Sequence, residues 1–187
     1  MADLNKALKK LWSVEFSNRV DLMLHTIAGD RGGMTYKGIA RKYHPAWDGW
    51  AFIDANPNPE MLEKNMVLQD KVEMFYHLNF WNKIKGDSIA FQAVAEELFL
   101  SAVNIGIKKA VMLAQEVSGT KIDGVFGEKT LMAINNVNAS DFCERYTELE
   151  MQYYEDIVER KPKQKKFFNG WIARANVING DNAGEIA

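Results

Sequence analysis

The spacing of apolar residues along the chain predicts helices almost throughout. Ser13 is a suitable N-cap for the first strong segment, and Gly29 stands where a left-handed residue commonly ends a helix. Between them, five apolar residues follow the i, i+4, i+7, i+8, i+11 spacing of one buried helical face. They are Phe16, Val20, Met23, Leu24 and Ile27. We therefore predict a helix over residues 13–28.

Seven further segments carry helical spacing or helix-start signals. The clearest start is Asn58-Pro59, because asparagine is a good cap and proline suits the first helical position. The predicted segments are 36–43, 58–81, 88–106, 107–117, a short helix from 128, 142–161 and 168–175. No run alternates apolar and polar residues over a useful length, so we expect at most a small β-hairpin. The predicted fold is all-α, a helical bundle of about eight helices.

Composition and charge exclude several classes of protein. The 187 residues are 47% hydrophobic and 26% charged, as in ordinary soluble globular proteins. A formal net charge of −2 argues against a general nucleic-acid partner. No apolar run approaches the roughly 20 residues of a membrane-spanning helix, so we expect no stable membrane insertion.

The remaining composition points to a protein without cofactors. Cys143 is the single cysteine, which excludes an intramolecular disulfide and favours a small core residue. His25, His44 and His77 are isolated from other metal-ligating residues, so we predict structural roles and no cofactor. The N-terminus lacks the apolar region of a signal peptide, and we expect synthesis in the cytoplasm. Any action outside the membrane would then need a separate route of release.

A glycine-rich stretch is the strongest local feature. Four of the fifteen residues from 25 to 39 are glycines, and the pair Gly32-Gly33 lets the backbone approach another group closely. Ala28 is predicted at the rim of the apolar stripe, facing this loop. We expect the other helices to support this corner.

Aromatic and basic residues outside the glycine loop allow two interpretations each. Trp47 and Trp50 either cover the edge of the core or form a wall on which the apolar face of a sugar stacks. The basic run at 161–166 is either a solvated loop or a surface attracted to an anionic polymer such as a cell wall.

Three blocks of the sequence resemble one known family. Residues 28–39 read Ala-Gly-Asp-Arg-Gly-Gly-Met-Thr-Tyr-Lys-Gly-Ile. They resemble the signature of the phage-type N-acetylmuramidases of glycoside hydrolase family 108: a Glu-Gly pair, a short loop, Asp-x-Gly-Gly-x-Thr and then Gly-Ile. Residues 99–135 resemble the predicted peptidoglycan-binding region that follows this lysozyme domain, and residues 161–171 resemble its closing segment. The matching residues of the second block are Ala102, Val103, Asn104, Gly106, Gln115, Asp123, Gly124, Val125, Phe126, Gly127, Lys129 and Thr130.

The resemblance implies an architecture and an activity. It implies a lysozyme-like helical fold with a muramidase domain over residues 12–97, a peptidoglycan-binding region over 98–176 and a flexible tail over 177–187. The implied reaction is hydrolysis of the β-1,4 bond between N-acetylmuramic acid and N-acetylglucosamine, with peptidoglycan strands as partner. A phage or prophage endolysin, released by a holin to act in the periplasm or cell wall, fits the missing signal peptide.

One departure from the family signature affects the activity. The family carries its essential glutamate directly before the first glycine of the loop, and this sequence has Ala28 there. Asp30, Thr35 and Tyr36 match the family. The resemblance implies Asp30 and Thr35 as further catalytic candidates, and Tyr36 and Asn104 as substrate contacts. Trp47 and Trp50 are added as substrate contacts on the sugar-stacking interpretation of their indole rings.

The chemistry of position 28 explains why the departure matters. A glutamate at the edge of an apolar stripe would have a raised pKa, as a general acid needs. Asp30 or the Thr35 hydroxyl would then orient a water, although Asp30 equally suits a cap of the loop. Alanine transfers no proton, so we expect an inactive chain, either through an introduced replacement or as a natural pseudo-enzyme that only binds the wall or regulates secretion or lysis. Glu15, Glu96 and Glu97 are expected on solvated faces rather than as replacement acids.

Overall fold

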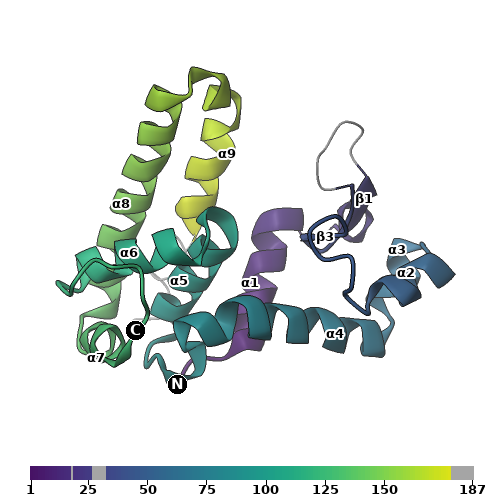
Figure 1. The fold of residues 1–187 in the computed structure, drawn as a ribbon, viewed down its shortest axis with the longest axis horizontal. Coiled ribbons are helices and arrows are strands. Elements are labelled where there is room, and N and C mark those ends of the chain that lie inside the picture. The colour runs from purple at the N-terminus through teal and green to yellow at the C-terminus, as the bar shows by residue number, and fades with distance from the viewer. Residues whose placement is uncertain (18, 27–32, 178–187) are drawn as a thin grey trace. The chain divides into compact units, whose positions relative to one another are not determined.

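The computed structural model describes residues 1–17, 19–26 and 33–177 (Figure 1). Within these ranges the chain forms nine α-helices and one small antiparallel sheet of three strands. The predicted mainly helical, lysozyme-like fold is therefore confirmed. The chain divides into two compact units, one of residues Leu8–Leu78 and the other of Met1–Ala7 with the chain from Asn79 onward. None of the described helices is long and apolar enough to cross a membrane.

The unit of residues Leu8–Leu78 combines short helices with the sheet. Most of α1 (Leu4–Phe16) belongs to it, followed by a 3-10 turn, η1 (Val20–Leu22), and the strands β1 (Leu24–Thr26), β2 (Met34–Tyr36) and β3 (Ile39–Ala40). Helices α2 (Trp50–Ala55), α3 (Pro59–Glu63) and α4 (Met66–Tyr76) complete it. Its largest fully buried side chains are Leu11, Tyr36, Ile39, Ile53 and Leu68.

The predicted helix over residues 13–28 is wrong. Helix α1 begins nine residues earlier, at Leu4, and ends at Phe16, where Ser17 has a positive φ of 48°. Leu24–Thr26 then forms β1, paired with β2 in the register Leu24↔Tyr36 and Thr26↔Met34. Backbone pairing with a strand ten residues away outweighs the helical spacing of the apolar side chains.

The predicted helix over residues 36–43 is also wrong, since this segment forms the β2–β3 hairpin. Tyr36 pairs with Ile39 across a two-residue turn, Lys37-Gly38. Both turn residues have positive φ, 44° and 80°, as the tightest hairpin turns require. The sheet therefore has one strand more than the small hairpin that we predicted.

The predicted helix over residues 58–81 divides into two. The predicted cap is confirmed, because the side chain of Asn58 accepts hydrogen bonds from the backbone N–H groups of Glu60 and Met61. Helix α3 ends after Glu63, and Asn65 caps a new helix by accepting from the N–H of Leu68. A π-helical turn (His77–Trp81) and two 3-10 turns, η3 (Asn82–Ile84) and η4 (Gly86–Ser88), follow α4.

The other unit is a helical bundle. It contains α5 (Gln92–Ile105), α6 (Ile107–Val117), α7 (Glu128–Asn135), α8 (Ala139–Arg160) and α9 (Lys165–Ala175), with a 3-10 turn, η5 (Pro162–Gln164), between the last two. Helices α5, α6 and α8 pack on one another, and α9 lies along α8 (Figure 1). Cys143 is fully buried, as predicted. The predicted tail lies outside the described residues from 178 onward.

Buried acidic residues between α5 and α8 contradict one expectation. The sequence places Glu97 on a solvated face, but only 2% of it is exposed. Its carboxylate accepts a hydrogen bond of 3.1 Å from the Thr147 hydroxyl on α8. Glu150, also on α8, is buried too. Glu97 shares α5 with the core residues Val94 and Leu98, which extend the buried face of the helix on either side of it.

Candidate functional site

The predicted catalytic corner lies between β1 and β2. Ala28 and Asp30 lie outside the described residues, and the strands that flank their segment are paired at Thr26 and Met34. Thr35 lies in the middle of the sheet, opposite His25 and Ala40. Its side chain is buried, and the hydroxyl lies 3.4 Å from the carbonyl oxygen of Gly33. The catalytic roles of Ala28, Asp30 and Thr35 stay predictions.

Tyr36 belongs to the core beneath the sheet. Its side chain is fully buried, and its hydroxyl accepts a hydrogen bond of 3.0 Å from the Gln69 side chain. Burial raises the pKa of Tyr36 to about 12. This position favours a supporting role over the predicted contact with substrate.

The side chain of Lys37, in the hairpin turn, contacts residues of three helices. Its ammonium lies 2.6 Å from the Glu63 carboxylate on α3 and donates a 2.6 Å hydrogen bond to Gln69 on α4. It also lies 5.2 Å from the ring centre of Trp12 on α1, and burial lowers the pKa of Lys37 despite its acidic partner. The backbone is held as well, because the Lys37 carbonyl accepts a 2.6 Å hydrogen bond from the Tyr76 hydroxyl. These contacts fix one end of the β2 strand that follows the predicted catalytic loop.

The two tryptophans of the predicted sugar-stacking wall differ in exposure. Trp50 is only 3% exposed, and its indole N–H donates a 2.7 Å hydrogen bond to the carbonyl of His44. Trp47 is partly exposed and meets Trp50 edge-on, with 5.1 Å between ring centres. The geometry favours a core role for Trp50 and leaves only Trp47 of this pair with an accessible ring. Asn104, the last predicted substrate contact, is partly exposed near the end of α5 in the other unit.

Gln115 organises the double-glycine loop before α7. Its buried side-chain carbonyl accepts from the N–H groups of Asp123 and Gly124 at 2.9 and 2.8 Å. Its amide N–H₂ donates to the Asp123 carboxylate, the Val125 carbonyl and the Thr130 hydroxyl at 2.9, 3.1 and 3.2 Å. The hydrogen bonds from Gln115 and from the Val125 N–H lower the pKa of Asp123. The residues that match the family pattern here are thus joined by hydrogen bonds within one loop.

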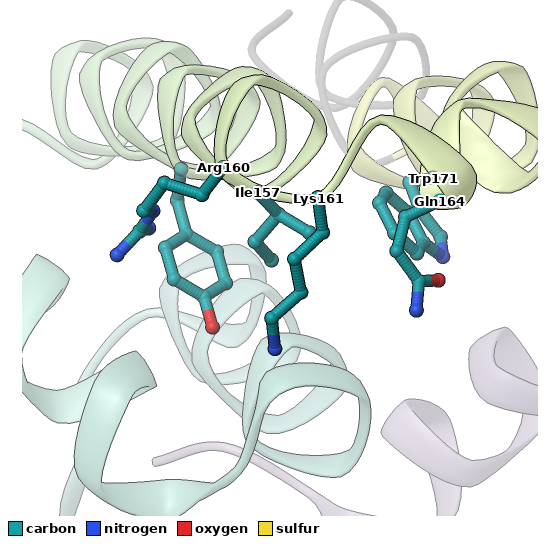
Figure 2. A pocket seen from close by; sticks show the side chains of 6 residues that line it. Ile157, Arg160, Lys161, Gln164 and Trp171 are labelled. Carbon is teal, nitrogen blue, oxygen red and sulfur yellow. The ribbon is translucent and has the colours of Figure 1, made fainter.

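Two cavities of the helical unit carry polar side chains. One, of about 640 Å³, lies over the Gln115 loop and is lined by side chains of both charges, including Lys121, Asp123 and Lys129. The other, of about 400 Å³, lies where α8 turns into α9 and is lined by aromatic and basic side chains (Figure 2). In this region the sequence pattern singles out Lys161 and Trp171 as parts of the family-like closing segment. Tyr153 and Ile157 have no feature beyond helical spacing that points to a site. Among the described residues, no three His, Cys, Asp or Glu side chains gather as metal ligands would.

These features define a mainly helical, lysozyme-like protein in which a unit of sheet and short helices accompanies a helical bundle with polar cavities. Residues 25–106 match the model of the glycosyl hydrolase 108 family, and residues 109–176 match a predicted peptidoglycan domain. Residues 25–106 are therefore similar to the glycosyl hydrolase 108 family, and a predicted peptidoglycan domain follows them, which confirms the resemblance. Glycosidase chemistry and peptidoglycan as the partner follow from this pair of matches.

A solved structure agrees with the fold. Brucella abortus SagA is 22% identical, with a TM-score of 0.67 over 96% of this chain and 93% of that one. At this identity the likeness establishes the fold alone. No curated protein matches the chain. The family match runs through α5, beyond the compact unit that ends at Leu78, so the predicted domain border at residues 97 and 98 stays a prediction.

Proposed function

We propose that this chain is an N-acetylmuramidase scaffold, built to cleave the β-1,4 bond between N-acetylmuramic acid and N-acetylglucosamine, and inactivated at Ala28. The observation that carries the proposal is the order of its parts: a glycosyl hydrolase 108 region followed directly by a peptidoglycan domain. Within the first part, Ala28 precedes Gly29 at the position of the signature glutamate.

The chemistry of the reaction explains the expected loss of activity. Cleavage of a glycosidic bond needs an acid that protonates the leaving oxygen while water or a carboxylate attacks the anomeric carbon. Loss of such an acid lowers the rate by roughly 10²–10⁴. In this proposal Asp30 and Thr35 orient the attacking water, and the contacts of Lys37 hold the strand that carries Thr35.

The experiment restores the missing acid. Ala28→Glu is compared with Ala28→Gln, which has the same size and polarity but no proton to donate at working pH. Purified peptidoglycan is incubated with each protein, and the products are analysed by mass spectrometry. We expect fragments with reducing-end muramic acid from Ala28→Glu only. If Ala28→Glu releases none, or releases fragments with another reducing end, the assignment is wrong.

A second candidate function is wall binding without catalysis. Ala28 itself favours it, because the replacement removes proton transfer while the peptidoglycan domain keeps its ordered Gln115 loop and the cavity over it. This candidate predicts that the protein co-sediments with insoluble peptidoglycan and that Ala28→Glu still shows no hydrolysis. Absence of co-sedimentation would argue against it.

The proposal extends to the site of action. We place the protein at the cell wall or periplasm, as an endolysin of phage or prophage origin that a holin releases. Expression with and without a holin, followed by measurement of the chain in the extracellular fraction, tests this route. Release that is equal in both cultures contradicts it.

A further inference from the structure

A cavity of about 400 Å³, open to solvent, lies at the turn between α8 and α9, and the proposed reaction does not use it (Figure 2). Its lining comes entirely from residues 153–171, within the peptidoglycan domain. The lining residues are Tyr153, Ile157, Arg160, Lys161, Gln164 and Trp171. The volume lies within the range of roughly 300–1,000 Å³ that is common for small-ligand sites. We call this cavity the α8–α9 pocket.

The aromatic walls of the α8–α9 pocket are held in place by their neighbours. Trp171 stacks on Tyr154, with ring centres 5.2 Å apart, and on Phe167 at 6.0 Å. Tyr153 is contacted by the ammonium of Lys109, which lies 4.7 Å from its ring centre. Both lining rings, Tyr153 and Trp171, are partly exposed. A ligand would therefore meet apolar faces that need little rearrangement.

The polar side of the pocket is basic. Arg160 and Lys161 are exposed, and no acidic side chain is among the described residues that line the pocket. The Arg160 Nε donates to the Asp156 carbonyl at 3.0 Å, which anchors the guanidinium beside the pocket. Across residues 1–17, 19–26 and 33–177, neither cation forms an ion pair with a carboxylate. Gln164 adds an amide that can donate and accept hydrogen bonds.

We propose that the α8–α9 pocket binds the carboxylate-bearing peptide stems of peptidoglycan rather than its sugar strands. The sugar strand is neutral where its lactyl groups are amide-linked to stems, so the anionic groups of the polymer lie on the peptides. A guanidinium and an ammonium that line the same pocket suit a carboxylate. The aromatic faces suit aliphatic parts of a stem, and Gln164 suits its amides. This inference rests on peptidoglycan being the polymer that the chain recognises.

The first test compares ligands on the full chain by titration calorimetry. The probes are a soluble disaccharide–peptide with free carboxylates, the same compound with its carboxylates amidated, and a neutral β-1,4 chain of N-acetylglucosamine, which has no lactyl groups. We expect the compound with free carboxylates to bind and the sugar chain without peptide not to bind. The amidated compound should bind at least about tenfold more weakly, because a hydrogen bond to a charged group contributes about that factor to affinity. Equal affinity for the free and amidated forms would overturn the inference. So would tighter binding of a poly(glycerol phosphate) chain, which would assign the pocket to phosphate polymers.

The second test separates the pocket from the general basic charge of the turn. Arg160→Gln with Lys161→Gln removes two charges that line the pocket. Lys163→Gln with Lys165→Gln removes two charges from the same turn outside the lining. We expect at least about tenfold loss of stem binding for the first pair, little change for the second, and retention of binding when Lys161 is replaced by Arg. Equal losses from both pairs would overturn the inference.

The outcome is distinguishable from that of the proposed function. Hydrolysis by the Ala28→Glu protein is measured on intact peptidoglycan, independently of stem affinity. If the Ala28→Glu protein is active and the Arg160 and Lys161 replacements leave stem binding unchanged, only the inference about the α8–α9 pocket is contradicted. Stem binding by the pocket together with an inactive Ala28→Glu protein contradicts the muramidase assignment alone.

Discussion

The ammonium of Lys37 lies 2.6 Å from the carboxylate of Glu63, and only 3% of the lysine side chain is exposed. The pair joins a hairpin turn to the end of α3, and the lysine adopts its positive φ within that turn. A charge so buried depends on its partner, because removing one member leaves the other without compensation. This pair therefore holds the β2–β3 turn that follows the predicted catalytic loop.

Glu63→Gln is expected to lower the free energy of unfolding by about 3 kcal/mol. This value is the lower end of the range for breaking a buried ion pair, because the Glu63 side chain is partly exposed. Urea unfolding measures the change. Glu60→Gln, an exposed replacement on the same helix, is the matched control and should change stability by less than about 0.5 kcal/mol.

The pH dependence of this variant gives a second measurement. Burial lowers the pKa of Lys37 below the ordinary lysine value of 10.5. The folded state therefore binds fewer protons than the unfolded state between the lowered pKa and 10.5, and the lysine's contribution to stability rises with pH there. Loss of the Glu63 carboxylate lowers the pKa of Lys37 further. The difference in unfolding free energy between the parent and Glu63→Gln should therefore become smaller as the pH approaches 10.5. A constant difference would show that charge is not its cause.

Features of the fold that depend on neighbouring residues can be predicted from the sequence better than features that depend on residues far apart in the chain. Asn58 and Pro59 start a helix because both effects act within one turn, and that prediction is confirmed. The β2–β3 turn depends on Lys37 in a left-handed conformation, which Glu63, Gln69 and Tyr76 stabilise from 26 to 39 residues away. No local pattern reveals such partners, so the apolar spacing predicts a helix where the folded chain pairs two strands.

The candidate site shows the same division. The glycine loop and the departure at Ala28 can be found from sequence because a family motif fixes their spacing. The burial of Trp50 and Glu97 cannot, since a pattern gives a residue type and a helical face but not which neighbours cover it. The α8–α9 pocket combines side chains from two helices, so only the folded chain brings Tyr153 and Trp171 to one cavity.

Two glycines of the Gln115 loop are expected to respond differently to alanine. Gly124 has φ +73°, and a Cβ there would lie 2.7 Å from the Lys108 side chain and 3.2 Å from its carbonyl oxygen. Gly124→Ala should therefore cost about 2 kcal/mol or more in urea unfolding. At Gly127 the backbone φ is negative and an added Cβ would meet no described atom within 4 Å, so Gly127→Ala is the matched control. Equal effects of the two replacements would contradict this description of the loop.

The last prediction concerns the buried carboxyl of Glu150. It accepts a 2.9 Å hydrogen bond from the Tyr154 hydroxyl, and burial raises its pKa above the ordinary 4.5 even though hydrogen bonds and Arg174 act in the opposite direction. The folded state therefore holds a proton that the unfolded state releases above pH 4.5. The stability from this group is complete below that pH and is lost as pH rises through the folded pKa.

Glu150→Gln keeps the hydrogen-bond acceptor for Tyr154 and removes the charge. We expect the variant to be more stable than the parent by about 1 kcal/mol at pH 7, because a neutral side chain avoids the desolvation of a carboxylate. At about pH 4 the difference should vanish, since the parent side chain is then protonated. Urea unfolding at both pH values measures this, with Glu144→Gln on the exposed side of α8 as control. A variant that is less stable than the parent at pH 7 would mean that the Glu150 charge is compensated in the fold, with Arg174 as the first partner to test.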